Sequence, residues 1–140
     1  MTLSLGVIGL GRMAQALLLP LLEQGDPAAA DVMAVVGQAA SVARLSAQLP
    51  ADLTLVAAAD PEAEAAWQAP VQLLAIKPYQ LDQVAASAPA VQGPDSPLLI
   101  SVLAGITLER LQRSFPGRVC VRAVPNTPSL VRAGLTGLAW

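Results

Sequence analysis

Short apolar runs alternate with longer, more polar segments along the chain. The runs are continuous rather than alternating with polar residues, which is typical of strands buried on both faces. They predict strands at residues 3–9, 31–36, 53–56, 71–76, 97–102 and 119–124, with a further strand beginning within 134–140. The intervening segments predict helices at residues 12–24, 41–49, 61–67, 78–88 and 107–115.

Several residues mark the helix ends. Gly25 stands where a left-handed stop is expected, Ser41 is the predicted cap of the second helix, and Thr107 that of the last. Pro20 predicts a kink in the first helix. Residues 57–69 are rich in alanine and acids, and we interpret them as a surface connection. This alternation predicts a doubly wound parallel α/β sheet, Rossmann-like, in one domain spanning residues 1–140.

Composition narrows the functional classes. The chain has 140 residues, of which 54% are hydrophobic and 13% charged, so it can bury a core and is not disordered. The densest apolar stretch, residues 16–22, contains a proline and ends at Glu23, which is too short for a membrane span. The first residues lack the basic region of a secretory leader. We expect a cytoplasmic protein that does not bind membranes.

Charge and residue types exclude further chemistry. The net charge is −2 and aromatic residues make up 3%, so the basic stripe and stacking rings of a nucleic-acid surface are missing. The chain has no histidine, which removes histidine-based triads and histidine metal sites, and we predict no metal. Cys120 is the single cysteine, and we interpret it as a buried strand thiol. The chemistry must come from backbone, amides, hydroxyls or a bound cofactor.

A glycine turn follows the first predicted strand. Gly9-x-Gly11-x-x-Ala14 is the pattern in which one glycine allows a tight turn, the next lets a pyrophosphate approach, and the small third residue packs the helix on the strand. The phosphates would meet the free amides at the helix start. A tight turn without a ligand is the alternative. The dinucleotide-binding residues predicted here are Gly9, Leu10, Gly11, Arg12, Met13 and Ala14.

The end of the second strand bears on which dinucleotide binds. Asp31 has the spacing of a ribose-binding acid but begins that strand instead of ending it. The strand end, residues 35–38, has no carboxylate to repel a 2′-phosphate, and Arg44 is the nearest cation. We therefore predict NADP, with NAD as the alternative.

Two later segments also follow strands. Lys77, the only lysine, comes directly after residues 71–76, at the edge where open α/β sheets bind ligands. A solvated lysine is the alternative. Asn126 lies between Pro125 and Pro128, which restrict the loop and present its amide with little freedom. A generic rigid loop is the alternative there.

Taken together, these segments resemble pyrroline-5-carboxylate reductase, in its N-terminal dinucleotide-binding domain. The resemblance rests on the segments VIGLGRMAQALL, LLAIKPYQLDQV, LLISVLAGITLERLQRSFPG and VRAVPNTPSLVRAGLTGLA. It implies hydride transfer from NADPH or NADH to pyrroline-5-carboxylate, yielding L-proline in proline biosynthesis. It implies no catalytic side chain that we can name.

The resemblance also implies site residues. Asn126 would lie close to the nicotinamide, and Asp60 aligns where the family often carries an asparagine, so that an acid there leaves the choice between NADPH and NADH open. The ribose and nicotinamide would be lined by Ala75, Ile76, Lys77, Pro78 and Ala104.

Members of this family continue with a helical domain that dimerises and forms most of the substrate pocket. We expect that domain to be absent from this chain, the full-length protein to be a homo-oligomer, and the isolated chain to turn over little substrate. The alternatives are another NADP-dependent reductase, of the β-hydroxyacid dehydrogenase or F420-dependent type, and a non-catalytic dinucleotide-sensing module.

Overall fold

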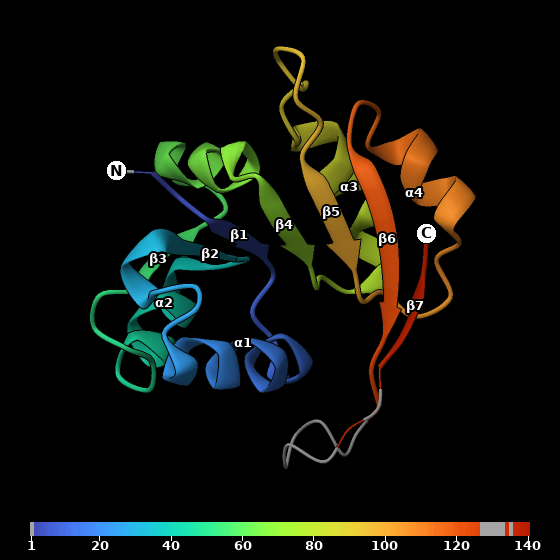
Figure 1. Ribbon diagram of the computed structural model, residues 1–140. Coiled ribbons are helices and arrows are strands. Elements are labelled where there is room, and N and C mark those ends of the chain that lie inside the picture. Colours follow the sequence, from blue (N-terminus) through green and yellow to red (C-terminus); the bar gives the residue numbers. More distant parts are fainter. Residues whose placement is uncertain (1, 127–133, 135) are drawn as a thin grey trace.

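A mostly parallel sheet forms the centre of the computed structural model, which describes residues 2–126, 134 and 136–140 (Figure 1). The described strands make one seven-stranded sheet in the order β3-β2-β1-β4-β5-β6-β7. Their bounds are β1 Leu5–Ile8, β2 Val32–Val36, β3 Thr54–Ala57, β4 Val71–Leu74, β5 Leu98–Ser101, β6 Val119–Val124 and β7 Gly137–Ala139. The predicted strands are thus confirmed, most of them trimmed by a residue or two at their ends.

The last strand differs from the rest in direction. Strands β1 to β6 pair in parallel, whereas β7 runs antiparallel to β6, with Arg122 opposite Ala139. β7 is thus the edge strand on that side of the sheet.

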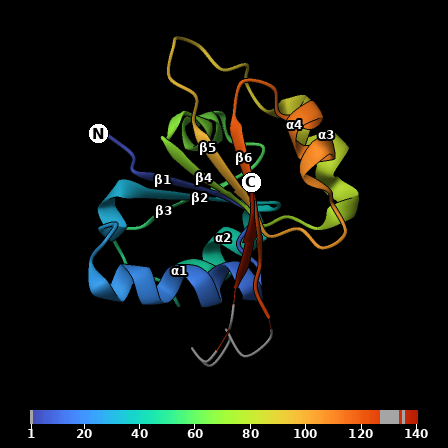
Figure 2. The ribbon, with the colours of Figure 1, turned by 45° about the vertical axis from the view of Figure 1, so that its right-hand side comes forward.

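Helices cover both faces of the sheet, as the alternation predicted (Figures 1 and 2). One buried cluster joins α1 and α2 to β1 and β2, and the other joins η2, α3 and α4 to β2, β4, β5 and β6. Alternate residues of β2 belong to the two clusters, Ala34 to the first and Val35 to the second. The helical elements are α1 Arg12–Gln24, η1 Ala29–Asp31, α2 Ala39–Ser46, η2 Pro61–Gln68, η3 Pro78–Gln80, α3 Leu81–Ser87 and α4 Leu108–Ser114.

The caps bear out some expectations and correct one. Gly25 ends α1 in the left-handed conformation at φ 77°, and the Thr107 hydroxyl accepts a hydrogen bond from the Arg110 amide at 3.2 Å. Helix α1 runs unbroken through Pro20. The predicted Ser41 cap is wrong, because α2 begins at Ala39 and Gln38 occupies the capping position.

The interpretation of residues 57–69 as a surface connection is wrong. Element η2 packs on the sheet, burying Ala66 and Trp67, and the Trp67 ring stacks on Phe115 with centroids 5.7 Å apart. Gly6 of β1 lies directly beneath η2, so close that an added Cβ would overlap the carbonyl oxygen of Ala66. Within the described residues, no helix is long and apolar enough to cross a membrane.

The close contact between β1 and η2 leaves no room for a side chain at Gly6, and this can be tested. We expect Gly6→Ala to lower the free energy of unfolding by about 3 kcal/mol, because a methyl group must push backbone away from backbone. Gly137→Ala is the matched control, since a Cβ there meets nothing within 4 Å, and we expect it to change stability by less than about 0.5 kcal/mol. Urea unfolding measures both, and equal effects would contradict this packing.

Candidate functional site

The carboxyl edge of the central strands is hollowed into a cavity of about 710 Å³. Its walls come from segments that follow strands: residues 9–14 after β1, 75–78 after β4 and 102–104 after β5. The end of β2 and the first turns of α2 close one side, and α3 closes the other. The cavity therefore lies where the chain leaves β1 and β4 in opposite directions, toward α1 and toward α3 (Figure 1).

The structure gathers nearly all of the sequence-predicted site residues around this one cavity. Asn126 follows β6 and is not among the residues that line it, and Thr127 and Pro128 lie outside the described residues. The role predicted for Asn126 beside a nicotinamide therefore stays a prediction. The predicted residues that do line the cavity are Gly9, Leu10, Gly11, Arg12, Met13, Ala14, Ala75, Ile76, Lys77, Pro78 and Ala104.

Gly9 locks the turn between its neighbouring strands. Its amide donates to the Val35 carbonyl oxygen at 2.9 Å, and the Ala75 amide donates to the Ile8 carbonyl oxygen at 2.8 Å. Gly9 has φ 91°, and an added Cβ would lie 2.7 Å from the Ala75 carbonyl oxygen. Both the backbone angle and the close approach require glycine here.

Gly11 is a glycine for a different reason. It is the N-cap of α1, its φ of −80° is open to any residue, and a Cβ there would meet no atom within 4 Å. Protein packing therefore does not demand glycine at this position. Its open side belongs to the cavity, beside the first-turn amides of α1, which have no partner within the helix. Such amides and the positive end of the helix favour an anion.

The loop after β4 is fixed by hydrogen bonds between Lys77 and Gln80, at the start of the following helical turn. The Gln80 side-chain oxygen accepts from the Lys77 amide at 3.0 Å, and the Gln80 amide donates to the Lys77 carbonyl oxygen at 2.9 Å. Pro78 occupies the first helical position, where its missing amide costs nothing. The exposed Lys77 side chain is thereby placed at the rim of the cavity.

The cavity is cationic. Arg12, Arg44 and Lys77 line it, and among the residues that the structure describes no aspartate or glutamate does. Asp60, the acid that the resemblance placed near the cofactor, does not line the cavity, and its carboxylate accepts a hydrogen bond from the Ala57 amide at 2.9 Å.

Some lining residues escaped the sequence reasoning. Ser41 was interpreted as a helix cap but lines the cavity together with Arg44, one turn further along α2. Gln83 and Ser87 of α3 also line it, and their spacing of four residues places them on one helix face. That spacing of polar residues in the helical segment after β4 was the signal available in the sequence.

Comparison with known proteins relates the chain to reductases. The family model described as NADP oxidoreductase, coenzyme F420-dependent, matches residues 4–105. Pyrroline-5-carboxylate reductase of Synechocystis sp. is 40% identical over 139 residues, covering 99% of this chain and 49% of the relative. The enzyme of that name from Haemophilus influenzae is 40% identical over 134 residues, covering 94% and 46%.

A solved structure agrees with these matches. The pyrroline-5-carboxylate reductase of Coxiella burnetii superposes with a TM-score of 0.81 at 27% identity, covering 99% of this chain and 49% of that one. The chain thus spans about half the length of the curated relatives it matches.

Gly9 and Gly37, both lining the cavity, separate the effects of strain from those of open space. We expect Gly9→Ala to lower the free energy of unfolding by about 3 kcal/mol, from left-handed strain together with the overlap on Ala75. Gly37→Ala, where a Cβ meets nothing within 4 Å, should stay within about 0.5 kcal/mol of the parent chain. Chemical denaturation decides, and a Gly9→Ala protein as stable as Gly37→Ala would contradict the turn described here.

Proposed function

Since the chain belongs to the family of coenzyme F420-dependent NADP oxidoreductases, we propose that its carboxyl-edge cavity is the NADPH site of a reductase that converts pyrroline-5-carboxylate to L-proline. The observation that carries the proposal is electrostatic. Arg12, Arg44 and Lys77 line the cavity, and no carboxylate of the described part of the chain does, whereas NADPH is a ligand with a pyrophosphate and a further phosphate.

The glycine turn fits the pyrophosphate. The space beside Gly11 is a cradle that a Cβ would enter, and the first-turn amides of α1 face it. Gly9 to Ala14 would hold this part of the cofactor. Gln15 steadies the turn from outside the cavity, because its side-chain amide donates to the Leu10 carbonyl oxygen at 3.1 Å.

The end of β2 fits a 2′-phosphate. Gly37 leaves room there, and Ser41 and Arg44 of α2 supply a hydroxyl and a guanidinium at the same wall. The acid that would favour NADH, Asp60, is engaged with the Ala57 amide instead. These residues support NADPH as the cofactor, with NADH binding more weakly.

The remaining wall of the cavity would receive the nicotinamide end of the cofactor. Residues 75–78 and Ala104 would line the ribose and nicotinamide, with Asn126 approaching from β6. NADPH, when bound, supplies the hydride, so the protein needs only to orient the ring and exclude water. The chain's own contribution is therefore positioning, and no residue is assigned proton transfer.

The substrate pocket and the assembly belong to the longer protein. Because the curated relatives are about twice as long, we propose that a helical domain beyond the N-terminal 140 residues completes the imino-acid pocket and dimerises in the cytoplasm. The dinucleotide site, by contrast, is built from one domain.

The family match favours a second candidate, in which NADPH reduces coenzyme F420 instead of an imine. The relatives of 40% identity carry the name pyrroline-5-carboxylate reductase, which supports the imine reaction as the first choice. A dinucleotide sensor without turnover would share the cavity and differ only in the assay below.

Arg44 tests the choice of cofactor. We expect Arg44→Ala to weaken NADPH binding about tenfold, the value of one charge-assisted contact, and to leave NADH binding within about twofold. Arg113→Ala is the matched control, because Arg113 is an exposed arginine of α4 outside the cavity. Titration by reduced-nicotinamide fluorescence gives both constants, and equal losses for the two cofactors would contradict the assignment.

Activity tests the division of labour between the halves. We expect the 140-residue chain to bind NADPH but to oxidise it at a barely detectable rate with pyrroline-5-carboxylate. The full-length protein should turn over that substrate and leave coenzyme F420 unchanged. Absorbance at the reduced-nicotinamide band follows both reactions. Robust turnover by the short chain, or a preference of the full-length protein for coenzyme F420, would overturn the proposal.

A further inference from the structure

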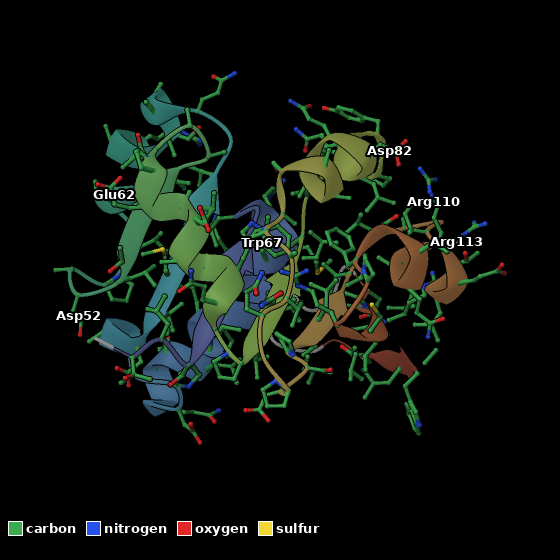
Figure 3. All side chains as sticks on the ribbon, turned by 90° about the horizontal axis from the view of Figure 1, so that it is seen from above. Asp52, Glu62, Trp67, Asp82, Arg110 and Arg113 are labelled. Carbon is green, nitrogen blue, oxygen red and sulfur yellow. The ribbon has the colours of Figure 1, made fainter. Side chains whose placement is uncertain are left out.

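A second cavity of about 680 Å³ lies at the opposite, amino edge of the sheet. Its walls come from the end of η2, the loops before β4 and β5, and Arg118 just before β6. Figure 3 views the molecule from this side, with Trp67 near the centre. The first cavity lies at the carboxyl ends of β4 and β5 and the second lies at their amino ends, so the two cavities are at opposite edges of the sheet.

Arg118 is the unusual residue of this cavity. The residue is 8% exposed, and no carboxylate among the described residues forms an ion pair with it. Its Nε donates to the Gln72 side-chain oxygen at 2.8 Å, its Nη2 donates to the Pro89 carbonyl oxygen at 3.0 Å, and the guanidinium lies 5.1 Å from the Trp67 ring centroid. Burial lowers the pKa of this guanidinium, but it stays charged near neutral pH.

One part of the guanidinium remains available. Nε and Nη2 have hydrogen-bond partners, whereas Nη1 has none within the described residues. No buried side-chain nitrogen or oxygen there lacks a partner, so Nη1 must be reached by solvent. A fixed cation that lacks an acidic counter-ion and has a free donor edge is suited to a carboxylate.

The other residues that line the cavity limit which class of ligand can carry that carboxylate. Glu64 and Asp95 also line the cavity and are exposed, and within residues 2–126, 134 and 136–140 they are the only other charged residues that do so. They disfavour phosphate and multiply charged anions, and Arg118 disfavours a simple cation. A ligand that carries one carboxylate and one ammonium group satisfies all three charges. The uncharged part of the wall includes Pro70, Pro89, Val91 and Pro97, which suit an aliphatic body.

We propose that the amino-edge cavity binds a free α-amino acid with an aliphatic side chain. The carboxylate lies on Arg118, the ammonium group lies toward Glu64 and Asp95, and the side chain lies against the prolines. Gln72 and the Pro89 carbonyl are positioning groups, since they hold the guanidinium in place before the ligand arrives. This site does not depend on the proposed reductase activity, because no residue is shared between the two cavities.

The experiment uses Trp67 as a local reporter. A Trp140→Phe background leaves Trp67 as the only tryptophan, and Trp67 lines the cavity. The probes are L-leucine, 4-methylpentanoate, which lacks only the amino group, and 3-methylbutylamine, which lacks only the carboxylate. We expect saturable fluorescence changes with L-leucine and at least about tenfold weaker binding of either partial probe. No response to L-leucine, or equal binding of 4-methylpentanoate, would overturn the proposal.

Variants separate binding from folding. Arg118→Gln should abolish the response, but it also removes the hydrogen bonds to Gln72 and Pro89 and can unfold the chain. The Glu64→Gln, Asp95→Asn double variant changes only exposed side chains. We expect it to bind L-leucine about tenfold more weakly and 4-methylpentanoate more tightly than the parent does.

Glu62→Gln, on the same η2 element but outside the cavity, is the matched control and should leave both probes unaffected (Figure 3). If the double variant behaves like the Glu62→Gln control, the site is not built for an amino acid and the inference is wrong. Reduced-nicotinamide titrations of the double variant and of the Glu62→Gln control should be unchanged, which distinguishes failure here from failure of the proposed cofactor site.

Discussion

The structure depends on the way the chain leaves β1 between two parallel neighbours. β2 and β4 both pair with β1. The Gly9 amide donates to Val35 of β2, and its Cα lies close to the backbone of Ala75, which follows β4. A side chain at Gly9 would separate these strand ends. From this point α1 goes to one face of the sheet, and the chain after β4 goes to the other. The crevice between them results from this divergence and needs no further device.

The two edges of the sheet then acquire different chemistry from the same strands. At the carboxyl edge, the walls present the first-turn amides of α1 and three cationic side chains, which suits a ligand with several phosphates. At the amino edge, a buried arginine is fixed by an amide and a carbonyl oxygen, and two carboxylates line the same cavity. β4 connects the edges, because Gln72 near its start holds Arg118 and Ala75 just after its end touches the glycine turn.

The sequence predicted what depends on local pattern. Strands buried on both faces appear as continuous apolar runs, so their positions and the doubly wound arrangement followed from the sequence, and the glycine turn was placed correctly. The packing of η2 was missed because a segment rich in alanine and acids is typical of a solvent-exposed connection. Ala63, Ala66 and Trp67 nevertheless have helical spacing and are all buried. They can reach the sheet because Gly6, about 60 residues earlier in the sequence, has no side chain that would overlap the Ala66 backbone.

Features that depend on contacts between distant parts of the chain could not be predicted from the sequence. The direction of β7 depends on where the chain returns to β6, and apolar periodicity carries no such information. Asn126 follows β6, whereas the cavity walls come from the segments after β1, β4 and β5, so its place beside a nicotinamide stays a prediction. Asp60 aligned with a cofactor residue, but its carboxylate bonds locally to Ala57, a competition between side chain and ligand that no spacing reveals.

The most direct test of the central claim is hydrogen–deuterium exchange of the chain with and without NADPH. The account predicts slower exchange of the amides in residues 9–14, 75–78 and 102–104, with residues 89–97 at the amino edge unchanged. Protection confined to the amino edge, or none at saturating NADPH, would contradict it.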